Sequence, residues 1–158
     1  MATGVVVYYS RSGNTKHMAE EIAEGMRDSG LKTDCLSIDE ISGEQLLGYD
    51  AIVIGSPCYY GQVAGPMKQF FDDMVTFHGR LSGKVGGAFS SSANIGGGNE
   101  TTLMSIICIM LVNGMVVQGD PQGDHYGPVA IGKPDARADQ QCRHRGQKIA
   151  ELTLKLAP

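Results

Sequence analysis

Short apolar runs and amphipathic stretches alternate along the chain. Runs rich in β-branched and aromatic residues lie at 4–9, 33–38, 51–56, 85–90 and 115–117. Continuous apolar runs of this length are typical of strands that are covered on both faces. Between and after these runs, apolar residues recur at helical spacing in 18–26, from about 65 to 74, in 103–111 and in 142–156. The pattern predicts strands that alternate with helices.

This alternation predicts one α/β domain that spans residues 1–158. Strands separated by helices favour a parallel sheet with helices on both faces and right-handed crossovers. Five strands in about 150 residues match the flavodoxin-like doubly wound sheet, with strand order 2-1-3-4-5. We expect the third strand to end at Pro57 and the segment 119–136 to be a long loop.

Composition and charge narrow the class of protein. Apolar residues make up 42% of the chain, charged residues 19%, and the net charge is −4, which speaks against a disordered tail and against a nucleic-acid partner. The most apolar segment, 103–117, is shorter than the ~20 residues that span a bilayer, so no membrane span is expected. The N-terminal residues lack the pattern of a signal peptide, which predicts a cytoplasmic protein. The four cysteines have no metal-ligand spacing, and we expect no metal site.

Glycine is the unusual residue, with 22 copies, roughly twice the ordinary usage of ~7%. Many of these glycines fall in loops that follow predicted strands, which is where doubly wound sheets bind ligands. The first such loop holds Ser10, Arg11, Ser12, Gly13, Asn14 and Thr15. Hydroxyls and a glycine in front of a helix N-terminus predict a phosphate cradle. The alternative is an ordinary serine or threonine helix cap.

Two further loops follow the third and fourth strands. The second contains Pro57, Cys58, Tyr59, Tyr60 and Gly61, and would place an aromatic ring over a flat ligand. The third contains Ser91, Ser92, Ala93, Asn94, Ile95, Gly96 and Gly97. Its small residues let backbone groups approach the edge of an isoalloxazine ring. The alternatives are loop-packing tyrosines and a flexible serine-glycine linker.

These motifs, taken in order, resemble the WrbA-like flavoproteins, which are NAD(P)H:quinone oxidoreductases of the flavodoxin superfamily. The resemblance rests on the segments 8–10, 55–62, 65–72, 89–91, 96–101, 113–115 and 126–128, and covers most of the chain. It implies that 10–15 hold the phosphate of FMN, that Cys58, Tyr59 and Tyr60 lie over the flavin, and that 91–97 contact its ring and ribityl chain. It further implies that Asn113 lies near the flavin and that His78 and Tyr126 line the substrate side, where either side chain would bind a quinone oxygen.

The resemblance predicts an FMN-dependent oxidoreductase that passes two electrons from NADH or NADPH to a quinone by a ping-pong mechanism. It also implies a homodimer or homotetramer, for which the apolar segment 106–111 offers a helix interface. The connection 39–48 is short, however, and lacks the insertion that helps longer relatives to form tetramers. Tyr59 stands where many relatives have an arginine, so the affinity for the nicotinamide cofactor is open.

Other interpretations remain open at this stage. A flavodoxin-type electron carrier that docks on redox partner proteins is favoured by acidic residues near the predicted rim, namely Asp72, Asp73, Asp120 and Asp124. An interaction domain without cofactor is the third, although the first strand ends in Tyr9 and Ser10 and lacks the acidic cluster of receiver domains. We expect His17 and His144 on solvated helix faces and His125 in a loop beside the pocket.

Overall fold

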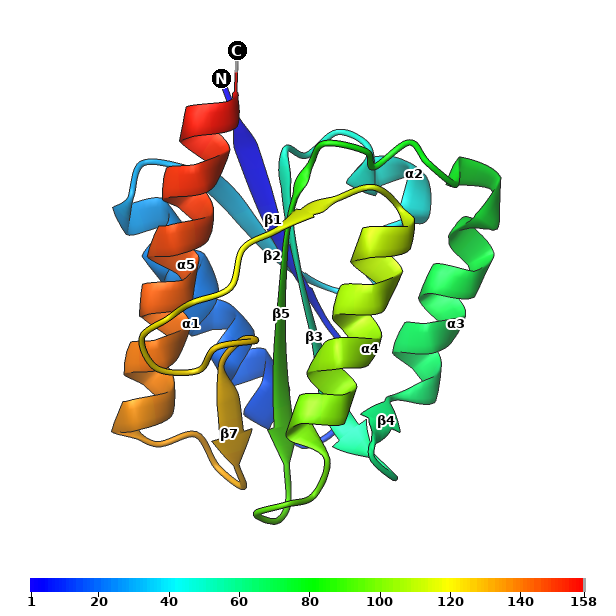
Figure 1. Ribbon diagram of the computed structural model, residues 1–158. Helices are drawn as coiled ribbons and strands as arrows, with labels where there is room; N and C mark the ends of the chain where they lie inside the picture. The colour runs from blue at the N-terminus through cyan, green and yellow to red at the C-terminus, as the bar shows by residue number, and fades with distance from the viewer. Residues whose placement is uncertain (158) are drawn as a thin grey trace.

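The computed structural model describes residues 1–157 and contains the predicted parallel sheet (Figure 1). The strands β1 (Thr3–Tyr8), β2 (Lys32–Ser37), β3 (Ala51–Tyr59), β5 (Val85–Ser92) and β6 (Val116–Val117) follow the order β2-β1-β3-β5-β6. All four pairings along this path are parallel. The predicted strand order 2-1-3-4-5 is therefore confirmed.

Helices cover both faces of the sheet, as predicted. The helices α1 (Asn14–Asp28) and α5 (Ala136–Leu156) lie on one face. The other face carries α2 (Gly43–Leu46), α3 (Gly65–Asp73), which continues into the 3-10 turn η1 (Met74–Phe77), and α4 (Asn99–Val112). Among the described residues, no helix combines the length and apolar character that crossing a membrane requires.

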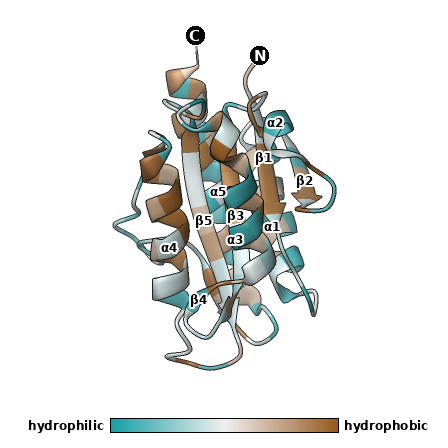
Figure 2. Cartoon of the chain, turned by 90° about the vertical axis from the view of Figure 1, so that its right-hand side faces the viewer, coloured by the Kyte–Doolittle hydropathy of each residue, from teal (hydrophilic) through white to brown (hydrophobic). Residues whose placement is uncertain are grey.

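The apolar runs are continuous because both faces of each central strand are buried. Val5, Val6 and Val7 of β1 are inaccessible to solvent. Side chains alternate along a strand, so Val6 packs with α1 and α5, while Val5 and Val7 pack with α2, α3 and α4. Figure 2 shows β1 brown and β5 paler behind two helices of the near face, α3 with much teal and α4 largely brown.

The helices α1 and α5 touch at two glycines. A Cβ atom on Gly25 would lie 2.2 Å from the carbonyl oxygen of Arg143, and one on Gly146 would lie 2.2 Å from that of Ile22. The missing side chains let the two backbones come into direct contact. This close packing fixes α5 against the sheet and, with it, the neighbouring Arg145.

Two sequence predictions about the strands were wrong, namely the end of the third strand and the loop 119–136. The third strand continues through Pro57 to Tyr59 and turns back into β4 (Gln62–Val63). On the side of β3 that faces β1, the carbonyl oxygen of Gly55 accepts a hydrogen bond from the N–H of Tyr9. Pro57 faces the same side, but lies beyond the last residue of β1. A residue without an N–H group is tolerated there because no partner strand needs the donor.

The segment 119–136 also contains a strand, β7 (Val129–Ile131). This strand pairs in parallel with the last residues of β5, whereas β6 pairs with the first ones. The edge of β5 that faces away from β3 thus pairs with β6 near its start and with β7 near its end. Between β6 and β7 the chain leaves the sheet. The excursion, residues 118–128, carries Tyr126 and is called the edge loop below.

Candidate functional site

The carboxyl ends of the strands enclose a cavity of about 370 Å³, to which all three glycine-containing loops contribute. It is lined by Arg11, Ser12, Asn14, Thr15, Pro57, Cys58, Tyr59, Ser91, Ser92, Ala93 and Gly132. This cavity is called the cradle. The parallel sheet explains the convergence, because β1, β3 and β5 are neighbours and all end at the same edge. The structure therefore brings the predicted loops together, although they lie far apart in the sequence.

The first loop presents free backbone donors to the cradle. Gly13 precedes α1 with φ +94°, and no side chain caps the helix. The first helical hydrogen bond runs from the N–H of His17 to Gly13, so the N–H groups of Asn14, Thr15 and Lys16 have no partner within the helix. The first turn of α1 also holds no acidic residue. The ordinary serine or threonine cap is thus excluded, and the helix end suits an anion.

Hydrogen bonds join the three loops to one another. The hydroxyls of Thr15 and Ser91, both buried, lie 2.9 Å apart. The thiol of Cys58 donates to the carbonyl oxygen of Gly97 at 3.1 Å. The hydroxyl of Thr101 lies 2.7 Å from the carbonyl oxygen of Gly61 and 2.9 Å from that of Gly98. These contacts therefore hold the three loops that form the cradle in place against one another.

Two linking residues, Asn99 and Thr101, were missed by the sequence analysis. Asn99 is 5% exposed, and its amide donates to the hydroxyl of Ser92 at 2.9 Å, which fixes the third loop. Both residues belong to the first turn of α4, directly after a glycine-rich loop. That position in the sequence was the available signal, since polar residues that begin a helix commonly hold the loop before it.

The two tyrosines of the second loop have different environments. Tyr59 lines the cradle and meets the ring of Tyr9 edge to face, with centroids 6.5 Å apart. Tyr60 is fully exposed and has φ +52°. With Gly61 at φ +74°, it forms the two-residue turn between β3 and β4, in which both central residues need positive φ. The turn thus holds the Tyr60 ring out at the rim.

The third loop lies along the opposite side of the cradle. Ser91, Ser92 and Ala93 line it directly. The loop then turns at Asn94, whose carbonyl oxygen accepts bonds from the hydroxyl of Ser92 and the N–H of Gly97. Ile95 is 89% exposed beside Gly96, so this predicted contact residue lies at the rim.

Three predicted residues line other hollows of the surface. Tyr126 is half exposed and lines a neighbouring hollow of about 930 Å³ with Gln62 and Thr101. His78 and Asn113 line a different hollow of about 510 Å³ that shares no residue with the cradle. They follow η1 and α4, and helices that begin at the carboxyl edge of a sheet end near its amino edge. Within one chain, the structure does not bring His78 and Asn113 to the cradle.

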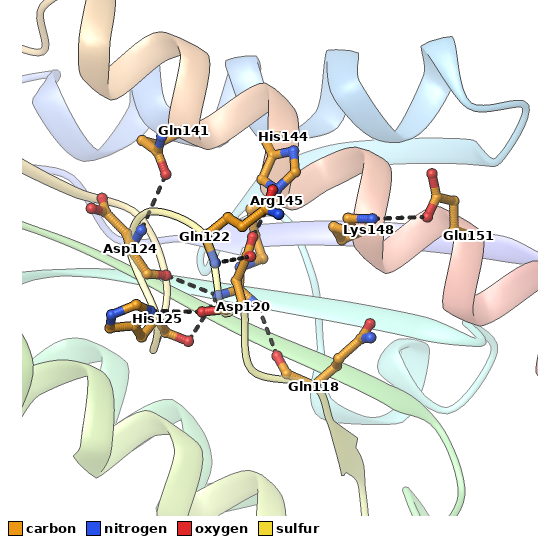
Figure 3. Close-up of polar contacts among 10 residues, drawn as sticks. All are labelled: Gln118, Asp120, Gln122, Asp124, His125, Gln141, His144, Arg145, Lys148 and Glu151. Carbon is orange, nitrogen blue, oxygen red and sulfur yellow. Dashed lines mark hydrogen bonds and ion pairs between the residues drawn. The ribbon is translucent and has the colours of Figure 1, made fainter.

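The edge loop is fastened to α5 by a buried arginine (Figure 3). Arg145 is 4% exposed and donates to the carbonyl oxygens of Gln118, Asp124 and His125, at 2.8, 3.2 and 3.4 Å. Beside it, the carboxylate of Asp120 pairs with the neighbouring histidine of α5. The loop that carries Tyr126 is therefore held from the face of the sheet opposite to α4.

The two histidines near this loop have defined partners. The Nε2 atom of His144 lies 2.7 Å from Asp120, so His144 is more than the solvated surface residue that we expected. The Nδ1 atom of His125 lies 2.8 Å from the carbonyl oxygen of Asp120. His17 pairs with Asp139 at 2.9 Å across α1 and α5. His144 and His17 thus join different elements, whereas the contact of His125 lies within the edge loop.

The charges in this cluster shift two pKa values. Burial opposes the ionisation of Asp120, but the N–H of Gln122, His144 and Arg145 outweigh it and lower the pKa of this carboxylate. Burial lowers the pKa of Arg145, while Asp120 and Asp124 oppose the change. Arginine remains charged at any ordinary pH. The edge loop therefore lies beside two ionised groups, the carboxylate of Asp120 and the guanidinium of Arg145.

The acidic residues near the predicted rim all have side-chain partners. Asp120 pairs with His144, and the carboxylate of Asp124 pairs with Arg137. Asp72 pairs with Lys68 at 2.6 Å, and Asp73 accepts a hydrogen bond from Gln69 at 2.8 Å. Three of these four carboxylates thus have a basic partner, and Asp73 has an uncharged one. Within residues 1–157, no group of three or more histidine, cysteine, aspartate or glutamate side chains could hold a metal ion.

Comparisons with known proteins agree with this geometry. A family model described as a flavodoxin domain matches residues 5–94. A protein of Aquifex aeolicus named flavodoxin is 40% identical over 96% of this chain and 86% of its own length. A protein of Azorhizobium caulinodans named NAD(P)H dehydrogenase (quinone) is 32% identical over 99% of each chain. Its alignment spans 197 positions, so that relative carries insertions that these 158 residues lack.

A solved structure extends the likeness to three dimensions. The flavodoxin, WrbA-like protein from Agrobacterium tumefaciens has a TM-score of 0.83 and 27% identity, and the match covers 98% of this chain and 99% of that one. The resemblance stated from the sequence is confirmed.

Proposed function

Because this chain belongs to the flavodoxin family of flavoproteins, we propose that it binds FMN in the cradle and passes two electrons from NADH or NADPH to a quinone. The family supports the flavin, and the names of relatives such as the Azorhizobium protein support the donor and the acceptor.

The residues of the cradle fit FMN. The free N–H groups at the start of α1, the hydroxyls of Ser10, Ser12 and Thr15, and the charge of Arg11 suit a phosphate. The rings of Tyr59 and Tyr60 supply flat apolar surfaces for the isoalloxazine. Backbone groups of 91–97 are the donors and acceptors for its polar edge, with Pro57, Cys58 and Gly61 completing the second loop.

FMN, when bound, would supply the redox chemistry by accepting a hydride equivalent from NAD(P)H and giving two electrons to a quinone. The chain itself provides binding and orientation. Tyr126, at the mouth of the neighbouring hollow, has a hydroxyl that can donate a hydrogen bond to a quinone oxygen. His78 and Asn113 have no role in this proposal, because they lie away from the cradle within one chain.

One observation carries the choice of an enzyme over a carrier. Carriers steer their protein partners with unpaired negative charge around the cofactor. Here three of the four candidate acidic residues, Asp72, Asp120 and Asp124, each face a basic partner. The neighbouring hollow of about 930 Å³ offers a small molecule room beside the cradle.

A second function keeps support from a different observation. The Aquifex relative, at 40% identity, is named flavodoxin, which favours an electron carrier that docks on redox proteins. Steady-state kinetics of the FMN-loaded protein with NADH or NADPH and benzoquinone separate the two functions. The enzyme gives parallel double-reciprocal lines, as a ping-pong mechanism requires. A carrier gives no turnover with either nicotinamide.

A further inference from the structure

The edge loop touches helices on both faces of the sheet. On one face, His144 and Arg145 of α5 contact it. On the other face, Tyr126 lines the hollow beside the cradle together with Thr101 of α4. The loop therefore connects α5 physically to the place where the proposed quinone would bind.

The carboxylate of Asp120 is the side-chain link between the loop and α5 (Figure 3). Its Oδ1 atom accepts the N–H of Gln122 at 2.8 Å, and its Oδ2 atom lies 2.7 Å from the Nε2 atom of His144. An ionised carboxylate only accepts hydrogen bonds, so this Nε2 atom carries the hydrogen. The side chain of Asp120 is 7% exposed and that of His144 is 33% exposed, so the histidine remains accessible to protons.

Two hydrogen bonds carry the link from Asp120 to the residue before Tyr126. The N–H of Asp120 donates to the carbonyl oxygen of His125 at 3.1 Å, and the Nδ1 atom of His125 donates to the carbonyl oxygen of Asp120 at 2.8 Å. On the other side of Tyr126, Gly127 packs against β5 and leaves no room for a side chain beside the carbonyl oxygen of Ala88. Tyr126 thus stands between two residues whose backbones are held.

The charge on the α5 side of this link depends on pH. Arg137 and Arg145, which also contact the loop, stay charged at any ordinary pH, and Gln141 has no charge. Histidine, in contrast, changes its charge between about pH 5 and 8. Burial opposes the ionisation of Asp120, but its backbone hydrogen bond and positive neighbours lower its pKa below the ordinary 3.8. The carboxylate therefore stays ionised while His144 gains or loses its charge.

The surroundings of His144 contain one other group that changes its charge in this range. The charged and titratable groups near it are Arg145, Lys148 and Glu151 of α5 and Asp124 and His125 of the edge loop. Lys148 and Glu151 lie 3.5 Å apart and keep their charges over this range. His125 contacts Asp120 and also lines a hollow beside α4. It therefore needs a control of its own.

We propose that His144 is a positioning residue for Tyr126, because it holds the edge loop through Asp120 and its charge makes this hold depend on pH. The inference rests on the proposed function, in which Tyr126 donates a hydrogen bond to a quinone oxygen. Protonated His144 and ionised Asp120 attract each other as opposite charges. This stabilisation is present at mildly acid pH and is lost as the pH rises and the histidine becomes neutral. The quinone should therefore bind more tightly at mildly acid than at alkaline pH.

Amide hydrogen exchange of residues 118–128 in the FMN-loaded protein tests the hold without any turnover. His144→Gln keeps a hydrogen-bond donor without a charge, and His144→Lys keeps a positive charge throughout. At pH 5.5 the edge loop of the parent should exchange about fivefold more slowly than that of His144→Gln, and at pH 8.5 equally fast. His144→Lys should exchange slowly at both pH values. Equal exchange in the parent and His144→Gln at pH 5.5 would overturn the proposal.

His125→Gln is the matched control for the second histidine of the cluster. Its amide also has a donor for the carbonyl oxygen of Asp120, but it carries no charge at any pH. The slower exchange at pH 5.5 than at pH 8.5, after correction for intrinsic rates, should persist in this variant. If the pH response disappears in His125→Gln and persists in His144→Gln, the assignment to His144 is wrong.

The oxidation of dithionite-reduced protein by benzoquinone in a single turnover tests the effect on Tyr126. The dependence of the rate on quinone concentration gives the dissociation constant of the quinone without any nicotinamide. At pH 5.5 this constant should be about threefold higher in His144→Gln than in the parent, and at pH 8.5 equal. Tyr126→Phe should abolish the difference, because the hydroxyl is the group that is positioned. A difference that persists in the Tyr126→Phe background would overturn the positioning role.

The two proposals can fail separately. If neither nicotinamide reduces the flavin, the reductase function fails. The exchange rates and the dissociation constant of the quinone, which need no nicotinamide, still decide whether His144 positions Tyr126.

Discussion

The hydroxyl of Thr15, in the first turn of α1, lies 2.9 Å from the hydroxyl of Ser91 at the end of β5. The two residues are 76 positions apart, and their contact joins the phosphate loop to the third loop of the cradle. Both side chains are at least 95% buried, at 2% and 5% exposure. The two walls of the proposed flavin site are therefore fastened directly to each other.

Removing this contact should weaken both folding and FMN binding. Thr15→Val leaves the buried hydroxyl of Ser91 without its partner, which costs about 1–3 kcal/mol of the free energy of unfolding. Because Thr15 aligns two walls of the cradle and also offers its hydroxyl to the phosphate, the dissociation constant for FMN should also rise about tenfold. Urea unfolding of the apoprotein and fluorescence titration with FMN measure the two effects.

Thr153→Val is the matched control, since this buried threonine donates to Ile149 within α5, away from the cradle. It should lower the free energy of unfolding without changing FMN affinity. Equal loss of FMN affinity in both variants would mean that Thr15 acts through stability alone.

The exposed tyrosine at the rim gives a second prediction. Tyr60 has φ +52°, which costs a non-glycine residue about 1–2 kcal/mol. In Tyr60→Gly, relief of this strain is partly offset by the greater freedom of glycine in the unfolded chain. The free energy of unfolding should therefore change by less than about 1 kcal/mol, while FMN affinity falls because a covering ring is lost. Unchanged FMN affinity in the titration would show that the Tyr60 ring does not cover the flavin.

The buried arginine of α5 should dominate the stability of the edge loop. Arg145→Met leaves the carbonyl oxygen of Gln118 without its donor, takes one of two donors from those of Asp124 and His125, and removes the positive charge of Arg145 from beside Asp120. We expect a loss of about 3–5 kcal/mol in urea unfolding, as for other broken buried charge networks.

Arg143→Met is the control on the same helix. Its guanidinium is about half exposed and pairs with Glu21 and Asp28. An exposed pair contributes about 0–1 kcal/mol, so this variant should remain close to the parent. Similar losses in the two variants would refute the special role of Arg145.

The stability of the edge loop should depend on pH through Asp120. The pKa of this carboxylate in the folded chain lies below its ordinary value of 3.8, chiefly because its hydrogen bonds and positive neighbours outweigh burial. Its stabilising contribution is therefore complete above about pH 4 and is lost as the pH falls through the lower, folded-state pKa. The difference in unfolding free energy between the parent and Asp120→Asn should shrink from pH 6 to pH 3. A difference that grows toward acid would contradict this sign.

The sequence predicted the sheet and the three loops because both follow from local patterns. The apolar run of Val5, Val6 and Val7 is visible in the sequence, and so is the loop of hydroxyls in front of α1. Parallel strand order then places the loops side by side. Thr101 escaped notice because it acts through a contact with the second loop, 40 positions away, and Asn99 because its bond to Ser92 forms only when the third loop folds back on α4.

Two predicted site residues that follow helices do not lie at the cradle. His78 and Asn113 came from the resemblance, and a single chain places both beyond helices that lead away from the cradle. The pairing of Arg145 with the edge loop joins residues 20 or more positions apart and has no local pattern. The homodimer or homotetramer stays a prediction, as does the cytoplasmic location.

The most direct test of the proposed function is anaerobic mixing of the FMN-loaded protein with NADH, and separately with NADPH, while the flavin absorbance is followed. The account predicts rapid loss of the flavin band in a two-electron step with at least one nicotinamide. Addition of benzoquinone should then restore the band completely. A flavin that dithionite reduces but neither nicotinamide does would contradict the reductase and leave the electron carrier as the function.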